Sequence, residues 1–166
     1  MTLVVAIEHK DQVFMGCDSM MSDAHTKDIF DRPKIIKKEG ILFGYSGNFI
    51  LDNLIRFSLQ IPKGEKNEDW LYTQLLPKIR EHFGEKPSLE GDALIVISGK
   101  VYHLQEDFSI VRSKRGYISI GSGNEVAFGA LHATKELLPE DRIRIALEAA
   151  SEYILSVGGP FHYMVI

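Results

Sequence analysis

Apolar residues follow two different periods along this chain, and the changes between them divide it into strand and helix segments. Short, nearly continuous apolar runs that end at turn residues are typical of strands buried on both faces. The polar stretch 18–32 contains no such run, so the first 45 residues are predicted to form four strands, paired as two hairpins in series. The strands expected along the whole chain span residues 3–7, 13–17, 34–38, 41–45, 93–97, 101–104, 117–120 and 161–165.

Helical spacing governs the middle of the chain and the segment before its last strand. Apolar residues recur every three or four positions over 49–59, until Pro62 and Gly64 end the run. A second helix is expected to begin at Asn67, an N-cap residue, and Pro77 within its apolar stripe predicts a kink or a break into two pieces. Two further helices are expected over 125–137 and 141–155, with Pro139 between them.

The order of elements is four strands, two helices, three or four strands, two helices and one strand. Strands that come in hairpin pairs exclude a simple alternating βαβ wind, whose parallel strands need helical crossovers. Nearly continuous apolar strands require cover on both faces. We therefore predict an α+β fold, a four-layer α/β/β/α sandwich of two antiparallel sheets. No linker or repeat interrupts the pattern, so residues 1–166 are expected to form a single domain.

Composition excludes several classes of protein. Apolar residues make up 45% of the chain and charged residues 25%, as in an average globular protein, which rules out a disordered tail or a fibre. The net charge of −4 argues against a nucleic-acid partner, which needs a basic surface. The apolar runs are too short to span a membrane. A single cysteine excludes an internal disulfide framework, so we expect a cytoplasmic protein.

The N-terminus carries the first candidate for chemistry. Met1 is followed by Thr2, whose small side chain permits removal of the initiator methionine. The exposed threonine would then hold an α-amine, whose pKa is ordinarily about 7.7–8.0, next to a hydroxyl. A nearby cation lowers such a pKa, so one residue can supply both the nucleophile and the general base. A Met-Thr start without any chemistry is the alternative.

Two charged residues stand at strand ends where they can meet that threonine. Asp18 comes directly after the apolar run 13–17, and Lys34 begins the strand that follows Pro33. Hairpins in series bring such strand ends together, so Thr2, Asp18 and Lys34 are expected to converge at one end of a sheet. The ammonium would neutralise a half-buried Asp18 and lower the pKa of the Thr2 amine. The alternative is a surface salt bridge, worth under about 1 kcal/mol.

The spacing of these residues is one of three motifs that point to a known family. Asp18 lies within a Gly-x-Asp-Ser segment, sixteen positions after Thr2 and sixteen before Lys34. Residues 44–48 read Gly-Tyr-Ser-Gly-Asn, and residues 121–123 read Gly-Ser-Gly at a strand-to-helix junction. In these motifs the sequence resembles the proteasome β-subunit family of N-terminal nucleophile (Ntn) hydrolases. The short chain is most similar to the HslV branch of that family.

The resemblance implies a threonine-type peptidase and gives each matched residue a role. Thr2 Oγ would attack the scissile carbonyl, and the Thr2 amine, directly or through a water, would move the proton. Lys34 would tune that amine, and Asp18 would hold Lys34 in place. The Gly47 N–H would bind the developing oxyanion, and Ser122 would form a hydrogen bond near the amine.

The same resemblance implies a pocket for the substrate residue that precedes the cut. The residues expected to line it are Met21, Arg32, Ile36 and Tyr45. Ser22 stands where the family has a threonine that aligns the substrate. A pocket with aromatic, aliphatic and cationic members does not indicate which residue is preferred.

One departure from the proteasome pattern lies just before Gly158 and Gly159. Ile154 and Val157 stand where proteasome subunits have an Asp and a Ser, and HslV proteins also lack that Asp. In the HslV branch, backbone carbonyls in this segment can hold a sodium or magnesium ion, which implies Ser151, Ile154 and Val157 as structural ligands. The resemblance implies that the reaction requires no cofactor.

The family assembles into rings around a closed chamber. The resemblance therefore implies homo-oligomeric rings, six- or seven-fold, that act on polypeptide substrates, with an AAA+ ATPase unfoldase as a candidate partner. A non-catalytic ring subunit and an Ntn amidohydrolase acting on a small amide stay open as alternatives. Nucleotide binding is disfavoured, because the third glycine of a G-x-G-x-x-G motif starting at Gly121 would fall at Val126. Cys17, mid-strand and without a partnered histidine, is predicted to be a small core residue.

Overall fold

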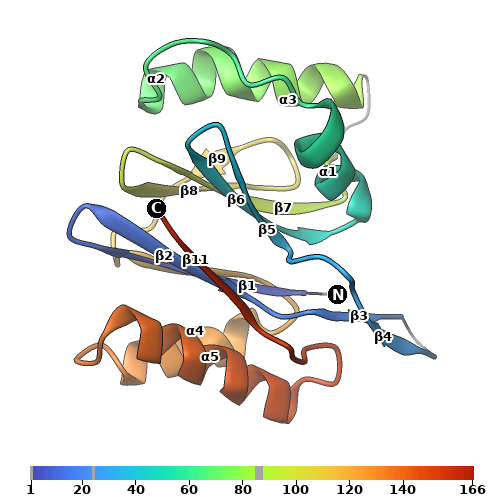
Figure 1. The fold of residues 1–166 in the computed structure, drawn as a ribbon, viewed down its shortest axis with the longest axis vertical. Coiled ribbons are helices and arrows are strands. Elements are labelled where there is room, and N and C mark those ends of the chain that lie inside the picture. Colours follow the sequence, from blue (N-terminus) through green and yellow to red (C-terminus); the bar gives the residue numbers. More distant parts are fainter. Residues whose placement is uncertain (1, 24, 85–87) are drawn as a thin grey trace.

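Two antiparallel sheets stack face to face between two layers of helices (Figure 1). The computed structural model describes residues 2–23, 25–84 and 88–166. The fold is α+β, and the four-layer α/β/β/α sandwich expected from the sequence is confirmed. No helix in the described part of the chain is long and apolar enough to cross a lipid bilayer.

One sheet holds the first and the last strand of the chain. Its strands, in spatial order, are β10 (Tyr117–Gly121), β1 (Leu3–His9), β2 (Gln12–Cys17) and β11 (His162–Val165). Its outer face is covered by α4 (Asn124–Ala133) and α5 (Pro139–Tyr153) (Figure 1). Pro139 was expected between these helices. It instead opens α5, because the first helical turn needs no N–H partner and suits the fixed φ of proline.

The other sheet lies against the first and carries the remaining helices. Its strands, in spatial order, are β5 (Ile35–Lys38), β6 (Ile41–Gly47), β7 (Gly91–Ile97), β8 (Lys100–Leu104) and β9 (Ile110–Val111). Its outer face is covered by α1 (Phe49–Asn53), the π-helical turn η1 (Leu54–Ser58), α2 (Glu68–Trp70), the π-helical turn η2 (Leu71–Leu75) and α3 (Leu76–Phe83). The break expected at Pro77 is confirmed, since η2 interrupts the helix just before the residue that lacks an N–H.

Strands at the centre of each sheet are buried on both faces, as their continuous apolar runs predict. In β1, Val4 and Ala6 face the second sheet, where they pack in one cluster with Leu42 and Leu94. Leu3, Val5 and Ile7 of the same strand face α4 and α5. This double burial fixes the register of β1, and therefore the position of the residue that precedes it.

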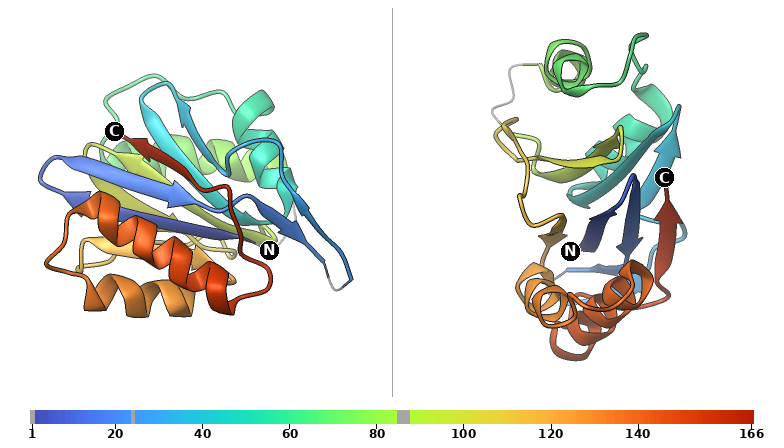
Figure 2. Two further views of the ribbon diagram at one scale, coloured as in Figure 1. Left: turned by 60° about the horizontal axis from the view of Figure 1, so that its bottom comes forward. Right: turned by 90° about the vertical axis from the view of Figure 1, so that its left-hand side faces the viewer.

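The segment 18–32 was predicted to contain no strand, and this prediction is wrong. β3 (Met20–Ser22) and β4 (Lys27–Ile29) form a small two-stranded sheet that projects as an arm from the body (Figure 2). Its turn is closed by Asp23, whose Oδ1 accepts the N–H groups of His25 and Thr26 at 2.7 Å. Strands of only three residues are too short to show an apolar alternation, so only this aspartate turn marks the hairpin in the sequence.

Candidate active site

A buried ion pair joins the end of β2 to the start of β5. Lys34 Nζ lies 2.9 Å from Asp18 Oδ1, and both side chains are fully excluded from solvent. The ammonium also donates to the Met20 carbonyl. The carboxylate accepts the Leu3 N–H at Oδ1 (2.9 Å) and the N–H groups of Met20 (3.1 Å) and Gly158 (3.4 Å) at Oδ2. Such burial is costly unless the charges are paired and hydrogen-bonded, as they are here, so the surface salt bridge is excluded.

Thr2 lies one peptide away from this pair, because the Leu3 N–H that bonds to Asp18 belongs to the next residue. The Thr2 carbonyl accepts the Ser122 N–H at 2.8 Å and the Ser122 hydroxyl at 3.3 Å. Gly121 has a φ of +97°, and a Cβ at this position would lie 2.0 Å from the Thr2 carbonyl oxygen. Only glycine permits this approach. The threonine is thus fixed on both sides, and it is 4% exposed.

The Gly47 N–H lies outside the hydrogen-bond ladder of its sheet. The neighbouring Asn48 N–H donates to the Glu90 carbonyl at 3.0 Å, and ladder bonds alternate along an antiparallel pair. The Gly47 amide therefore points away from β7, toward the side of β5. Because β5 begins only at Ile35, opposite Gly44, this N–H lies beyond the end of that strand. An amide in this position is available to bind an oxyanion.

Ser156 lies beside Ser122 in the candidate site, although the sequence did not indicate it. Its Oγ lies 2.9 Å from Ser122 Oγ, and the residue is 6% exposed. The prediction had matched Val157 to the family's serine position, but Val157 is a core residue that packs against Gly123. A serine within three residues of Gly158 was the available signal.

The loop that follows α5 is what brings Ser156 to the site. Gly158 donates to Asp18, and its carbonyl accepts the Ser19 N–H at 3.0 Å. The Ser19 hydroxyl donates to the Pro160 carbonyl at 2.6 Å. These bonds attach residues near the end of the chain to the end of β2, which no local sequence pattern reveals.

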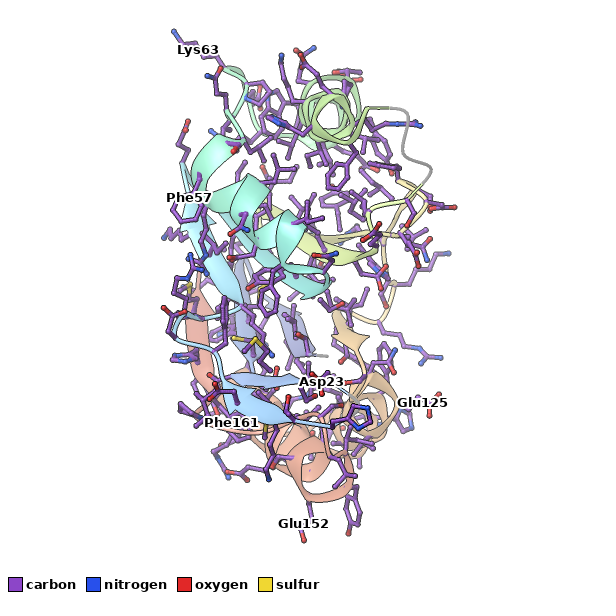
Figure 3. All side chains as sticks on the ribbon, turned by 90° about the vertical axis from the view of Figure 1, so that its right-hand side faces the viewer. Asp23, Phe57, Lys63, Glu125, Glu152 and Phe161 are labelled. Atoms are coloured by element: carbon purple, nitrogen blue, oxygen red, sulfur yellow. The ribbon has the colours of Figure 1, made fainter. Side chains whose placement is uncertain are left out.

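The five residues predicted to contact substrate lie in three different surroundings. Met21 and Ser22 lie on β3, and Ser22 lines a cavity of about 420 Å³ with Ser156 and residues of the arm, including Asp23 (Figure 3). Arg32 and Ile36 instead line a cavity of about 360 Å³ beside η1, where Phe57 points outward (Figure 3).

Tyr45 does not take the pocket position predicted for it. It is 1% exposed, in the core between the five-stranded sheet and its helices. The alternation of side chains along β6 turns this residue toward the helix layer, so its ring is not on a pocket wall.

The predicted metal ligands Ser151, Ile154 and Val157 all lie at or just after the end of α5. The Ile154 carbonyl accepts the Val157 N–H at 3.0 Å, which closes a tight turn and leaves this oxygen one further lone pair. Among the described residues, no group of three or more His, Cys, Asp or Glu side chains is placed to bind a metal. A sodium or magnesium ion here would therefore take its protein ligands from main-chain carbonyl oxygens, and this site stays a prediction.

Cys17 is buried at the end of β2, and its burial raises the pKa of the thiol to about 12. The reactive thiolate is therefore strongly disfavoured at neutral pH. Cys17 packs in the core between the sheets, as predicted.

Solved structures show which known fold this arrangement belongs to. BPH from Thiobacillus denitrificans matches with a TM-score of 0.77 over 99% of this chain and 97% of that chain, at 18% identity. HslV from Trypanosoma brucei matches with 0.76 over 99% and 98%, at 16% identity. The chain has the fold of HslV and the proteasome β-subunits. Anbu (ancestral beta-subunit) from Yersinia bercovieri shares this HslV-like fold, with 0.71 over 99% and 81% at 15% identity.

No protein-family model matches the sequence, and no curated protein does. TM-scores of 0.71–0.77 establish the HslV-like fold, and at 15–18% identity the likeness shows the fold alone.

Proposed function

We propose that this chain, once Met1 is removed, is the threonine-type peptidase subunit of a homo-oligomeric HslV-like protease that cleaves polypeptides. The observation that carries the proposal is the fully buried Asp18–Lys34 pair, one peptide from Thr2. A buried ion pair contributes no more to stability than well-packed apolar residues in its place. A fixed cation beside a threonine amine is instead what this nucleophile requires. The HslV-like fold of the chain supports the same function.

Each residue of the cluster has a step in this chemistry. The Thr2 Oγ attacks the substrate carbonyl and passes its proton to the Thr2 amine, which then protonates the leaving amine. A water molecule then hydrolyses the acyl-enzyme, and the Thr2 amine accepts its proton and returns it to Thr2 Oγ. The charge of Lys34, held by Asp18, favours the unprotonated amine. The Gly47 N–H binds the oxyanion, an interaction worth about 3 kcal/mol. Ser122 positions the main chain of Thr2.

Intact-mass measurement of the purified chain is expected to show the loss of one methionine. After incubation with epoxomicin, the compound bound in a structure of BPH from Thiobacillus denitrificans, it is expected to show one inhibitor per chain. The Thr2→Ala variant is the matched control, because alanine also permits methionine removal but has no hydroxyl. A Met1-free wild-type chain that takes no inhibitor would favour a non-catalytic ring subunit.

The native mass is expected to correspond to rings of about six or seven subunits, alone or in pairs. Large apolar side chains are exposed around α5, with Leu138 66%, Tyr153 76% and Leu155 96% exposed. Leu138 precedes the start of α5, whereas Tyr153 and Leu155 lie together at its end and are the candidates for a surface that a partner covers. Light scattering after gel filtration measures the mass, and Leu155→Glu tests whether this face holds subunits together. A monomeric wild type would contradict the ring and favour hydrolysis of a small amide.

We propose the cytoplasm as the compartment and an AAA+ ATPase as the partner that unfolds substrates. A closed ring admits only unfolded chains, so a peptidase of this kind requires such a partner for folded proteins. Cys17, free and buried, fits a reducing compartment.

A further inference from the structure

A second buried charge cluster lies between β6 and α1, and the proposed chemistry does not use it. Asp52 is fully buried, and its Oδ1 accepts the Arg56 Nε–H at 2.5 Å. The Tyr45 hydroxyl and Asp52 Oδ2 are also buried, each without a direct hydrogen-bond partner among the described residues. Burial, followed by the charge of Asp52, raises the pKa of Tyr45. The hydroxyl therefore stays protonated and is the donor available to that carboxylate.

The cluster is tied to the backbone on both sides of Lys34. Arg56 Nη2 donates to the carbonyl of Pro33, the residue immediately before Lys34. The Tyr45 N–H donates to the Lys34 carbonyl at 3.2 Å. Since β5 begins only at Ile35, both bonds act on a segment that precedes the strand. They hold the two carbonyls that flank the Lys34 Cα.

The turn that carries Arg56 is itself fastened to β5. Lys38 Nζ donates to the carbonyls of Ile55 (2.8 Å), Arg56 (3.4 Å) and Leu59 (2.8 Å). The Leu59 N–H also bonds to the Leu54 carbonyl, which closes the π-helical turn η1. Single π-helical turns recur at functional sites, where they redirect side chains. Here the guanidinium of Arg56 lies between Asp52 and the Pro33 carbonyl.

We propose that Arg56 is a positioning residue for Lys34. Through the Pro33 carbonyl, and with its own guanidinium held by Asp52, it fixes the backbone from which the Lys34 ammonium reaches Asp18. This inference rests on the proposed function, because Lys34 matters through its charge beside the Thr2 amine. The alternative is that the cluster only stabilises the fold. The two explanations predict different values of kcat and different pH profiles for a variant that still folds.

The test compares peptide hydrolysis by Arg56→Met and by the double variant Asp52→Asn/Arg56→Met. The single variant leaves Asp52 buried without its partner, which is strongly destabilising, whereas the double variant removes both charges. We expect kcat of the double variant to fall about tenfold while KM changes less than about twofold, because a misplaced catalytic group slows the reaction rather than binding. The acid limb of the kcat/KM profile moves to higher pH, because a more distant ammonium lowers the pKa of the Thr2 amine less.

Two further variants separate positioning from loss of charge. Arg56→Lys is expected to restore part of kcat, because an ammonium can bond to Asp52 or to Pro33 but lacks the planar fork that reaches both. Lys37→Met removes an exposed cation of β5 that lines the same cavity as Arg56. It is expected to keep the wild-type kcat and pH profile.

A double variant that folds and keeps the wild-type kcat and pH profile overturns the proposal. A Met1-free wild type that hydrolyses no peptide shows that the proposed function fails, which is a separate result. Hydrogen exchange of the Tyr45 amide then decides the inference, since this N–H bonds to the Lys34 carbonyl. Exchange at least about tenfold faster in the double variant supports the positioning role, and unchanged exchange overturns it.

Discussion

Replacing Thr2 with alanine is expected to reduce peptide hydrolysis by at least about a thousandfold while leaving the fold and the assembly intact. The substitution removes the nucleophilic hydroxyl and keeps the α-amine, and the loss of a nucleophile removes the covalent route entirely. Stability should change little, because no hydrogen bond that the structure describes for Thr2 uses its hydroxyl; the bonds from Ser122 go to its main-chain carbonyl. Steady-state cleavage of a fluorogenic peptide, with gel filtration of the same sample, measures both quantities.

Two controls make this result specific to the hydroxyl of residue 2. Thr2→Ser retains a nucleophile and permits the same methionine removal, so it is expected to keep substantial activity. Cys17→Ser replaces the thiol near the site, which burial keeps protonated, and is expected to have a mild effect. Wild-type turnover by Thr2→Ala, or its loss in Cys17→Ser, would show that another group performs the reaction.

Removal of the Lys34 ammonium is expected to be nearly as damaging, with kcat/KM at pH 7 falling at least about a hundredfold. Lys34 Nζ bonds to Asp18 Oδ1, and the same oxygen accepts the N–H of Leu3, the residue that follows Thr2. Without its charge the pKa of the Thr2 amine rises toward about 7.7–8.0, which leaves about a tenth of the amine unprotonated at pH 7. The alkoxide that develops on Thr2 also loses the cation that stabilises it, which accounts for the remainder of the loss. The rate should therefore recover in part as the pH is raised, and a pH–rate profile measures this shift.

The variant must be chosen so that the protein still folds. Lys34→Met alone leaves the Asp18 carboxylate buried without its partner, at a cost of about 3–5 kcal/mol. Asp18→Asn/Lys34→Met removes both charges and keeps side chains of similar size, so it separates chemistry from stability. Thermal unfolding of both variants gives the stability difference. A folded double variant with the wild-type rate and pH profile would contradict the role assigned to the ammonium.

The secondary structure follows closely from the sequence where one face or stripe is clearly apolar. The double burial of β1, the break before Pro77 and the two antiparallel sheets all come from local periodicity and turn residues. The β3–β4 arm does not, because strands of three residues hold no period to detect. Pro139 also shows the limit, since a proline marks either a gap between helices or the first turn of one.

The residues of the candidate site also differ in whether the sequence predicts them. Thr2, Asp18 and Lys34 are recognisable because each stands at one end of an apolar run. They were expected at one end of a single sheet, but Lys34 precedes β5 of the other sheet, so their convergence depends on how the two sheets stack. Ser156 and the Arg56–Asp52 pair are not recognisable, because their partners lie 34 and 23 positions away, at Ser122 and Pro33. Tyr45 was expected on a pocket wall and is instead in the core.

By itself, the sequence determined the alternation of strand and helix segments, the four layers that follow from it, and the three charged or nucleophilic groups at strand ends, because apolar periodicity and turn residues are local features of the chain. Only the tertiary structure decided that the ion pair is completely buried, that the loop after α5 closes over Asp18, and that η1 holds the backbone of Lys34. The reason is physical. Burial and long-range hydrogen bonds depend on how whole layers pack together, and that packing is a property of the entire chain.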